Sequence, residues 1–400
     1  MDHHINLKSN GFIRKELIVE LINIMDYWSQ NMVDELNGGF YGRIDGRNIL
    51  QKDAEKGVVL NSRILWTFSA AFNLFKDPKY KKIAERAYLY IIEHFLDKQF
   101  GGVYWMLDVK GTPLVTKKQI YAQAFAIYGL SEYYKINEDP SVLSKAVNLF
   151  DLIEKHAFDP IENGYFEAFS CEWSPLKDVR LSEKDLNAQK TMNTHLHILE
   201  AYTNLYSVWK DENLKGRLRN LIDVLIEYFV SPSNHFNLFF DETWRSLSND
   251  FSYGHDIEGS WLLVEAAEAI EDKNVIKKIK PIAVEMVDAS LEGMDNDGGL
   301  MNEGNSKGII DTDKHWWPQA EALVGLINAW QMTNNKFYLD QVFKTWIFIK
   351  DSLIDREHGE WFWKVSKEGV ISFEEDKAGP WKCPYHNGRA MMECLKRLGY

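Results

Sequence analysis

Two kinds of helical segment alternate along this chain. Segments such as 79–97 and 211–230 carry apolar residues at helical spacing on one side and many charges on the other, as surface helices do. Segments such as 121–134, 259–264 and 322–330 are apolar on nearly every side and carry one charge or none. A helix that is apolar all round is buried all round. The pattern therefore predicts outer helices that alternate with inner helices.

A short turn motif separates each outer segment from the inner segment that follows it. The motif is a Gly or Asn followed by aromatic or apolar residues, and it recurs at intervals of about sixty residues through the whole chain. Its six copies contain Gly39, Gly102, Gly164, Asn237, Gly299 and Gly359. A period of this length indicates a repeat architecture in which each copy is one pair of helices.

Six such pairs predict an all-α fold, an (α/α)6 barrel of six helical hairpins. No linker rich in Pro or Ser interrupts the repeat, so we expect a single catalytic domain spanning residues 1–400. The outer-to-inner connections are long, and runs such as 38–48 and 101–113 have the turn chemistry of β-hairpins. Short β-hairpins should therefore lie in the loops of one face, where function is expected. The alternative is an open α-solenoid built from the same hairpins.

Composition and charge narrow the classes of function. A net charge of −13 argues against nucleic acid as a partner. The 14 Trp, 18 Tyr and 22 Phe are enough to fill a large core or to line a groove that stacks flat ligands. Three cysteines without C-x-x-C spacing fit a reduced compartment, and neither a signal pattern nor an apolar run of ~20 residues is present. We expect a cytoplasmic monomer that engages no membrane.

Polar side chains gather at the starts of the predicted inner helices, which should converge on a central pocket at the loop-rich face. Polar groups at the mouth of an apolar core are costly unless they are used or paired. The candidates are Arg63, Tyr121, Gln123, Asn193, His195, His197, His255, Asp256, Glu258, Trp316, Trp317, Gln319, Glu321, Trp381, Tyr385, His386, Asn387 and Arg389. Three of the six starts carry histidine, whose ordinary pKa of ~6.5 suits proton transfer in both directions near neutrality.

The remaining histidines are assigned to other places. His315 stands beside a tryptophan pair and is expected to support the site from behind. Solvated or turn positions are expected for His3, His4, His94, His156, His235 and His358.

Metal binding and carboxylate catalysis are the rival uses of these starts. His195 and His197 have i,i+2 spacing, which points two rings apart on a helix, and no H-E-x-x-H motif is present. We therefore expect no metal. Glu258 and Glu321 start adjacent inner helices and could form the acid pair of a glycoside hydrolase. We favour histidine as acid and base, with the glutamates holding imidazoles or sugar hydroxyls.

These segments resemble the N-acylglucosamine 2-epimerase superfamily, and within it the cellobiose 2-epimerases, over essentially the whole chain. The matching motifs are 192–202 (MNTHLHILEAY), 253–258 (YGHDIE), 314–322 (KHWWPQAEA), 359–363 (GEWFW) and 381–389 (WKCPYHNGR), together with Arg63 and Tyr121. The His and Glu positions are shared widely in the superfamily, which includes mannose isomerase. The last two motifs are more particular to cellobiose 2-epimerases.

The resemblance implies an enzyme that needs no metal or organic cofactor. It implies inversion of C2 of the reducing-end glucose in a β-1,4-linked disaccharide, cellobiose or lactose, to the mannose epimer. The ring opens, the C2 proton is removed, and a proton returns to the other face of an enediolate. His255 and His386 match the two residues that exchange protons at C2. His197 matches a third histidine that assists ring opening or positioning.

Other candidates fit roles around that chemistry. Arg63 can hold the charge that develops on the enediolate oxygen. Tyr121 and Asn193 can hydrogen-bond sugar hydroxyls, and Trp316 and Trp381 offer flat faces to sugar rings.

Two alternative functions stay open at this point. One is an aldose–ketose isomerase of the mannose isomerase type on the same scaffold. The other is a hydrolytic or non-catalytic sugar-binding barrel that uses Glu258 and Glu321. The product separates the three possibilities, because it is an epimer, a ketose or a pair of cleaved monosaccharides.

Overall fold

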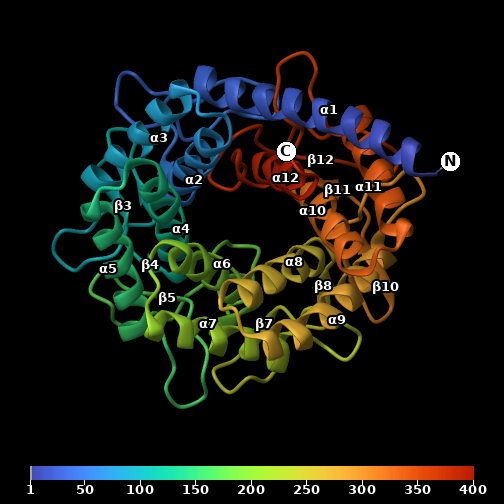
Figure 1. The fold of residues 1–400 in the computed structure, drawn as a ribbon. Helices are drawn as coiled ribbons and strands as arrows, with labels where there is room; N and C mark the ends of the chain where they lie inside the picture. The colour runs from blue at the N-terminus through green and yellow to red at the C-terminus, as the bar shows by residue number, and fades with distance from the viewer. Residues whose placement is uncertain (1) are drawn as a thin grey trace.

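The computed structural model describes the backbone of residues 2–400 and the side chains from residue 13 onward. Over that range twelve α-helices form two concentric rings of six (Figure 1). Each inner helix packs against the next, and the last inner helix packs against the first, which closes the ring. The predicted (α/α)6 barrel is confirmed, and the open α-solenoid is wrong.

The helices alternate strictly between the two rings. The inner ring contains α2 (Val58–Phe75), α4 (Ile120–Asn137), α6 (Met192–Val208), α8 (Tyr253–Ala269), α10 (Trp316–Thr333) and α12 (Tyr385–Arg397). The outer ring contains α1 (Asp2–Asn31), α3 (Pro78–Tyr90), α5 (Pro140–His156), α7 (Glu212–Val224), α9 (Lys273–Ser290) and α11 (Lys336–Phe348). Four outer helices continue into a short turn of different pitch, namely η1 (Ile91–Phe95), η2 (Leu225–Phe229), η3 (Leu291–Gly293) and η4 (Ile349–Leu353).

Local sequence signals start the two sets of helices differently. Five outer helices begin after a side chain that accepts hydrogen bonds from backbone N–H groups of the first turn, and these caps are Asp77, Asp139, Asp211, Asp272 and Asn335. Such tight caps keep the inner-to-outer connections short. Five inner helices follow directly on an extended residue of a short strand, and in α6 and α8 that residue, Thr191 or Ser252, also caps the helix with its side chain. The long loops therefore lie together at the face where the inner helices begin.

Short antiparallel strands in these loops join neighbouring repeats. One sheet contains β1 (Lys56–Gly57), β2 (Met106–Leu107) and β3 (Pro113–Val115), and another contains β8 (Asp250–Ser252), β9 (Glu303–Asn305) and β10 (Gly308–Asp311). Three further pairs are β4 (Lys118–Gln119) with β5 (Ala168–Phe169), β6 (Lys190–Thr191) with β7 (Phe239–Phe240), and β11 (Lys314–His315) with β12 (Lys364–Val365). The run 101–113 leads through β2 into β3 as a hairpin, whereas 38–48 makes only isolated bridges.

The turn motif occupies the same place in all six repeats. In each, the residue before the turn bridges the residue after it, and these pairs are Val33–Phe40, Leu96–Val103, Phe158–Tyr165, Val230–Phe236, Met294–Leu300 and Ile354–Trp361. The fourth copy predicted at Asn237 is therefore misplaced, because His235 is the residue that corresponds to Gly39 and Gly102. In the sixth copy Glu360 takes this place, one residue after the predicted Gly359. The fourth turn contains no glycine and uses Asn234 in the left-handed region, with φ of 64°, so the sequence pattern matched a later aromatic run.

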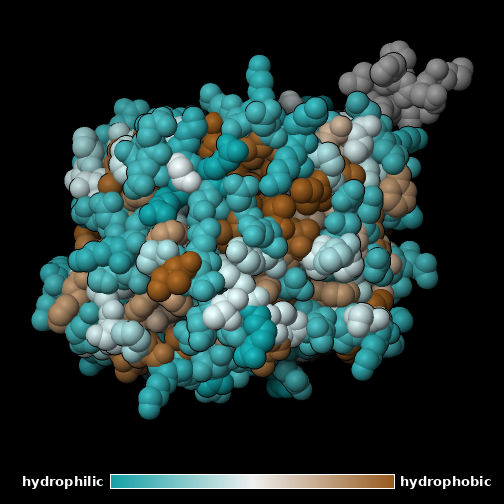
Figure 2. Space-filling model, turned by 90° about the horizontal axis from the view of Figure 1, so that it is seen from below, coloured by the Kyte–Doolittle hydropathy of each residue, from teal (hydrophilic) through white to brown (hydrophobic). Residues whose placement is uncertain are grey.

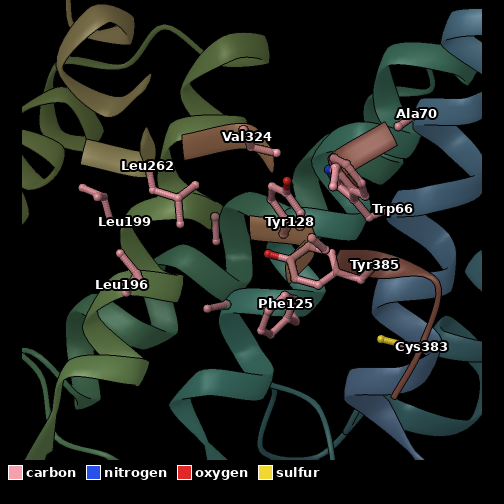
Figure 3. Close-up of a cluster of buried hydrophobic side chains, with 14 of the residues drawn as sticks. Trp66, Ala70, Phe125, Tyr128, Leu196, Leu199, Leu262, Val324, Cys383 and Tyr385 are labelled. Atoms are coloured by element: carbon pink, nitrogen blue, oxygen red, sulfur yellow. The ribbon is translucent and has the colours of Figure 1, made fainter. Parts of the chain in front are cut away.

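Large aromatic side chains fill the barrel axis beneath the helix starts. Trp66 stacks on Tyr128 with ring centroids 5.0 Å apart, and Tyr385 meets Trp66 edge-on at 5.8 Å (Figure 3). Phe125 meets Tyr385 edge-on at 5.4 Å. These rings give the polar residues of the inner helices a packed floor, because they are themselves almost completely buried.

The first inner helix is unusually apolar. By length and apolar character α2 could cross a membrane, with a mean hydropathy of 1.2, but 78% of it is buried inside the protein. Burial of that extent is the pattern of a core helix. The face drawn in Figure 2 is mostly hydrophilic and is interrupted by small apolar patches.

Candidate active site

The inner helices present a ring of polar side chains at one depth. The fifth residue after the first residue of the helix is Arg63 in α2, His197 in α6, Glu258 in α8 and Glu321 in α10. All four are buried, with 0–3% of their surface exposed. Because these helices begin in the same register, the four side chains reach the barrel axis together. The prediction that helix starts converge is borne out by this arrangement.

Arg389 of α12 ties the carboxylates of three helices together. Its guanidinium donates to Glu200 of α6, to Glu258 at 2.5 Å and to Glu321 at 2.7 Å. Burial alone would lower the pKa of Arg389, but these carboxylates hold it well above its usual value. Burial raises the pKa of Glu258 to about 7, and the neighbouring charge of Glu321 adds to the effect. A buried cluster of one cation and three acids therefore forms the centre of the site.

His386 is held by one member of this cluster. Its Nδ1 lies 2.7 Å from Oε1 of Glu321, and 3.9 Å from the nearest oxygen of Glu258. Burial lowers the pKa of His386 well below its usual value, and the nearby guanidinium groups of Arg63 and Arg389 lower it further. The neutral ring donates Nδ1–H to the carboxylate, so its Nε2 carries a free lone pair.

His197 is held in the same way by a different acid. Its Nδ1 lies 2.9 Å from Oε2 of Glu200, one helical turn further along α6. The other oxygen of Glu200 accepts hydrogen bonds from Tyr385 and Arg389. Burial alone would raise the pKa of Glu200, but Arg389 and His197 together hold it at about 2. Glu200 is therefore a permanent carboxylate that orients His197.

His255 has no such partner. Its Nδ1 is buried and makes no hydrogen bond to any described residue. The ring packs against Trp317 with centroids 4.6 Å apart, and Trp317 lies 5.6 Å from the ring of His386. Loss of solvation lowers the pKa of His255 to about 3, and the charge of His197 makes a smaller contribution. The two histidines therefore both pack against one indole and are both neutral near pH 7.

Arg63 and Tyr121 form the opposite wall. Nη2 of Arg63 donates to the Tyr121 hydroxyl at 2.7 Å, and the guanidinium lies 4.1 Å from the ring centroid of Phe125. Tyr121 meets the ring of His197 edge-on at 5.1 Å, which joins this wall to the acid–histidine cluster. Arg63 makes no ion pair with a described carboxylate, so its charge remains available to an anionic ligand.

A cavity of about 700 Å³ opens at the loop-rich face beside His255 and Trp317, and Arg63, His197 and His386 are not among its lining residues. Asn193, His255 and Trp317 line it, together with segments of the loops around residues 179–188 and 302–311. Oδ1 of Asn193 is buried and has no hydrogen-bond partner among the described residues. A cavity of this size accommodates a small sugar, and unpaired polar atoms in its wall can bind hydroxyl groups.

The tryptophans divide into two groups. Trp316 is only 3% exposed and packs on Trp363 with ring centroids 4.6 Å apart, so its face is already covered. Trp381 is partly exposed and lies 5.8 Å from Trp105 and 6.1 Å from Tyr121. The structure therefore brings Trp381 and Trp317, rather than Trp316, to positions where a ring face can meet a sugar.

His195 belongs to the scaffold rather than to the site. Its Nδ1 bonds the Thr191 carbonyl at 2.7 Å, and its Nε2 accepts the backbone N–H of Tyr165 at 2.8 Å. In the second repeat Gln123 binds both backbone groups of Val103 at the equivalent place. The i,i+2 spacing separates the roles of His195 and His197, because residues two apart lie on opposite sides of a helix.

The structure also shows where the other histidines from residue 13 onward lie. His94 and His156 are partly exposed and stack on Tyr90 and Trp173, and His358 is exposed. His315 lines the cavity. Of the two positions predicted for His235, a solvated one and a turn, the structure shows the turn, and the side chain is only 3% exposed with Nδ1 at 2.7 Å from Asp256. His3 and His4 lie outside the described side chains.

One set of donors has the composition of a metal site. Glu258, Glu321 and His386 offer ligand atoms that all lie within 4.8 Å of one another. Nη2 of Arg389 already lies within hydrogen-bond distance of both carboxylates. The guanidinium therefore supplies the positive charge that the two acids require.

Sequence reasoning gave no individual role to two residues that organise the site, Glu200 and the candidate Arg389. Glu200 follows His197 by three residues and Arg389 follows His386 by three, so each shares a helical face with its histidine. That spacing was the available signal. Their mutual contact could not be read from the sequence, because 189 residues separate Glu200 from Arg389.

Comparison with known proteins places this site in a family. Residues 39–390 match the family model described as N-acylglucosamine 2-epimerase. A cellobiose 2-epimerase of Bacteroides fragilis is 51% identical over 386 residues, which cover 96% of this chain and 98% of that protein. A sugar epimerase from a ruminal bacterium superposes with a TM-score of 0.92 at 37% identity, covering 97% of this chain and 99% of the other. A cellobiose 2-epimerase from Bacillus thermoamylovorans gives 0.91 at 40% identity, with 97% and 100% covered. The chain belongs to the N-acylglucosamine 2-epimerase family.

Proposed function

We propose that this sugar epimerase inverts C2 of the reducing-end glucose of a β-1,4-linked disaccharide such as cellobiose or lactose. The observation that carries the proposal is the placement of His255 and His386. These two neutral imidazoles, His386 buried and His255 partly exposed, come from different inner helices and both pack against Trp317. Inversion at C2 needs one base to remove the proton and a second group to return a proton to the other face.

His386 is suited to exchange a proton with C2. Its Nδ1–H donates to Glu321, which leaves Nε2 free to accept the proton. The C2 proton of the open-chain sugar is acidic, because C2 is adjacent to the C1 aldehyde. When Nε2 accepts that proton the ring becomes positive, and the carboxylate at 2.7 Å stabilises it. His255 exchanges the proton at the other face of C2.

Charge also develops on the sugar during this step. Removing the C2 proton creates an enediolate with negative charge on the C1 oxygen. Arg63 is buried without a carboxylate partner and donates to Tyr121, so both groups can hydrogen-bond that oxygen. Preorganised donors of this kind stabilise the transition state because they need no reorientation as the charge appears. His197, oriented by Glu200, is placed to move the proton that ring opening requires.

The remaining residues position the disaccharide. Asn193 presents an unpaired oxygen to the cavity, and one oxygen of Glu258 is buried without a hydrogen-bond partner among described residues. Trp381 and Trp317 offer partly exposed ring faces. Glu258 and Glu321 are poorly placed as the acid pair of a hydrolase, because both bind one nitrogen of Arg389 rather than opening toward the cavity. We infer no catalytic metal.

One incubation tests the proposal. The protein is incubated with cellobiose in D2O, and the products are followed by NMR. We expect glucosyl-mannose with deuterium at C2 of the reducing-end residue and an intact glycosidic bond. A ketose with deuterium at C1 would identify an aldose–ketose isomerase, and free glucose would identify a hydrolase. Epimer without C2 exchange and without a C2 primary isotope effect would refute the enediolate route.

A further inference from the structure

A buried ion pair anchors the turn of most repeats to the start of the next inner helix. The lysine stands two residues before the helix and the aspartate at the start of the turn, and the pairs are Lys56–Asp34, Lys118–Asp97, Lys190–Asp159 and Lys314–Asp295. Their N···O distances are 2.7–2.8 Å, and each lysine is at most 1% exposed. In the sixth repeat Asp355 pairs with Lys377, which stands eight residues before α12 rather than two.

The fourth repeat replaces this anchor. Phe251 stands in the lysine position two residues before α8, and Ser231 stands in the aspartate position. The backbone bond that closes the turn runs from Ser231 to His235, just as Asp97 bonds Gly102 in the second repeat. His235 therefore occupies the place of a glycine.

The side chain of His235 fills the space that the missing lysine would occupy. A Cβ at Gly299 in the fifth repeat would lie 2.6 Å from a carbon of Lys314, which explains why that turn needs glycine. In the fourth repeat the imidazole of His235 stacks on Phe251 with centroids 3.7 Å apart and planes 2° apart. Its Nδ1 lies 2.7 Å from Oδ2 of Asp256, the fourth residue of α8.

This replacement lies next to the histidine that lacks a partner. Asp256 follows His255 directly, and its other oxygen accepts the backbone N–H of Phe236 at 2.7 Å. His197 and His386 are each oriented by a carboxylate at Nδ1, whereas Nδ1 of His255 has no partner among the described residues. The position of His255 therefore depends on the backbone of the first turn of α8 and on packing against Trp317.

We propose that His235 is a positioning residue for His255, acting through Asp256. The imidazole fixes the Asp256 carboxylate, and that carboxylate fixes the first turn of α8 against the turn 231–236. The inference rests on the proposed role of His255 as a base or acid at C2. It assigns to the fourth repeat a function that the Lys–Asp anchors of the other repeats do not carry.

Two substitutions at His235 separate positioning from simple stability. His235→Phe keeps a ring on Phe251 but leaves the Asp256 carboxylate without its side-chain partner. His235→Asn retains an N–H at the place of Nδ1. We expect the Phe variant to lower kcat for cellobiose epimerisation at least ~10-fold with KM changed less than ~3-fold, because small misplacement of a reacting group reduces rate far more than binding. The Asn variant should restore kcat to within ~3-fold of the parent.

The matched control removes the equivalent anchor of another repeat. Lys118→Met breaks the Lys118–Asp97 pair, and its kcat should stay within ~3-fold of the parent when only folded protein, measured by circular dichroism, is counted. Equal kcat losses in His235→Phe and Lys118→Met would overturn the inference, because His235 would then be an anchor like the others. Failure of His235→Asn to restore kcat would also overturn it.

Two further measurements keep the test decisive. If His235→Phe does not fold, His235→Gln replaces it, because the longer amide cannot donate from the place of Nδ1, and the same kcat criterion applies. His255→Ala is assayed in parallel. Near-parental turnover of His255→Ala would remove the proposed role of His255 and the inference with it. An inactive His255→Ala beside a fully active His235→Phe would overturn the positioning role alone.

Discussion

Replacement of Glu321 by Gln tests whether the carboxylate beside His386 drives the proton transfer. The substitution keeps the size and shape of the side chain and removes its charge. In the parent, Oε1 accepts from His386 and Arg389 at 2.7 Å each, and Oε2 accepts from the indole of Trp261 at 3.1 Å. A glutamine can keep its oxygen toward His386 and Arg389 only by pointing its amide N–H groups at the indole N–H of Trp261.

The charge effect sets the magnitude. When His386 accepts the C2 proton, its positive charge and the carboxylate lie roughly 4 Å apart, which corresponds to about 4 kcal/mol at an effective dielectric constant of 20. Arg389 shares the same carboxylate oxygen, so we take ~2 kcal/mol as the lower bound. Each ~1.4 kcal/mol changes the rate tenfold. Glu321→Gln should therefore lower kcat roughly 30- to 1000-fold.

Glu258→Gln is the matched control. Glu258 binds the same nitrogen of Arg389 but lies 3.9 Å from Nδ1 of His386. Its pKa of about 7 means that a large share is already neutral near pH 7, a state that glutamine resembles. We expect a kcat loss below ~10-fold in this variant.

The assay measures initial rates of cellobiose epimerisation at pH 7 by NMR of the mannose-type anomeric proton. The rates are normalised to folded protein. A Glu321→Gln enzyme within threefold of the parent would refute the electrostatic role of this carboxylate. Equal kcat losses in the two glutamine variants would show that net charge of the cluster, rather than the contact with His386, controls the rate.

Three further outcomes follow from the scaffold and the charge cluster. His195→Gln should fold and turn over like the parent, because Gln123 makes the equivalent bonds, whereas His195→Leu should lose ~1–3 kcal/mol in urea unfolding through an unpaired backbone N–H. Burial lowers the pKa of His195 to about 3, so the unfolded chain binds more protons between pH 3 and 6.5 and stability falls as pH falls. The urea midpoint of the parent should therefore drop more between pH 7 and 5 than that of His195→Gln, and equal drops would contradict the assignment. Turnover should survive exhaustive dialysis against a chelator, because Arg389 supplies the positive charge at Glu258 and Glu321, and loss restored by a divalent ion would refute this.

The fold could be predicted from the sequence because its signal is repeated six times. Helices apolar on all sides, such as α4, are buried, and each follows a turn of the same kind. The fourth turn, which the pattern misplaced by two residues, lacks glycine, and the imidazole of His235 instead fills a space that a lysine side chain fills elsewhere. That exchange depends on Phe251 and His235, which are sixteen residues apart and carry no periodic signal. A local sequence pattern therefore locates a turn only where that turn is built from its usual residues.

The convergence of the candidate side chains was predictable, but the contacts among them were not. Helix register brings Arg63, His197, Glu258 and Glu321 to one depth, so their convergence follows from counting residues into each helix. The i,i+3 spacing indicates that Glu200 can hold His197, but the contact of Glu321 with His386 depends on side-chain direction and on Arg389, which spacing does not encode. The same limit explains Trp316, because a helix start does not reveal that Trp363 covers its ring.

The charge of the buried cluster favours the state that the reaction must pass through. Glu200, Glu258 and Glu321 surround a single guanidinium, and even with Glu258 protonated the acids outnumber Arg389. The excess negative charge lies against His197 and His386, the two rings that the acids touch. Burial keeps His386 neutral at rest, so its ring is ready to accept a proton. Once it does so, the imidazolium offsets the excess carboxylate charge. The contact with Glu321 therefore offsets part of the cost that burial and the two guanidinium groups impose on the protonated ring, and the barrier to proton removal from C2 is lower than it would be without that carboxylate.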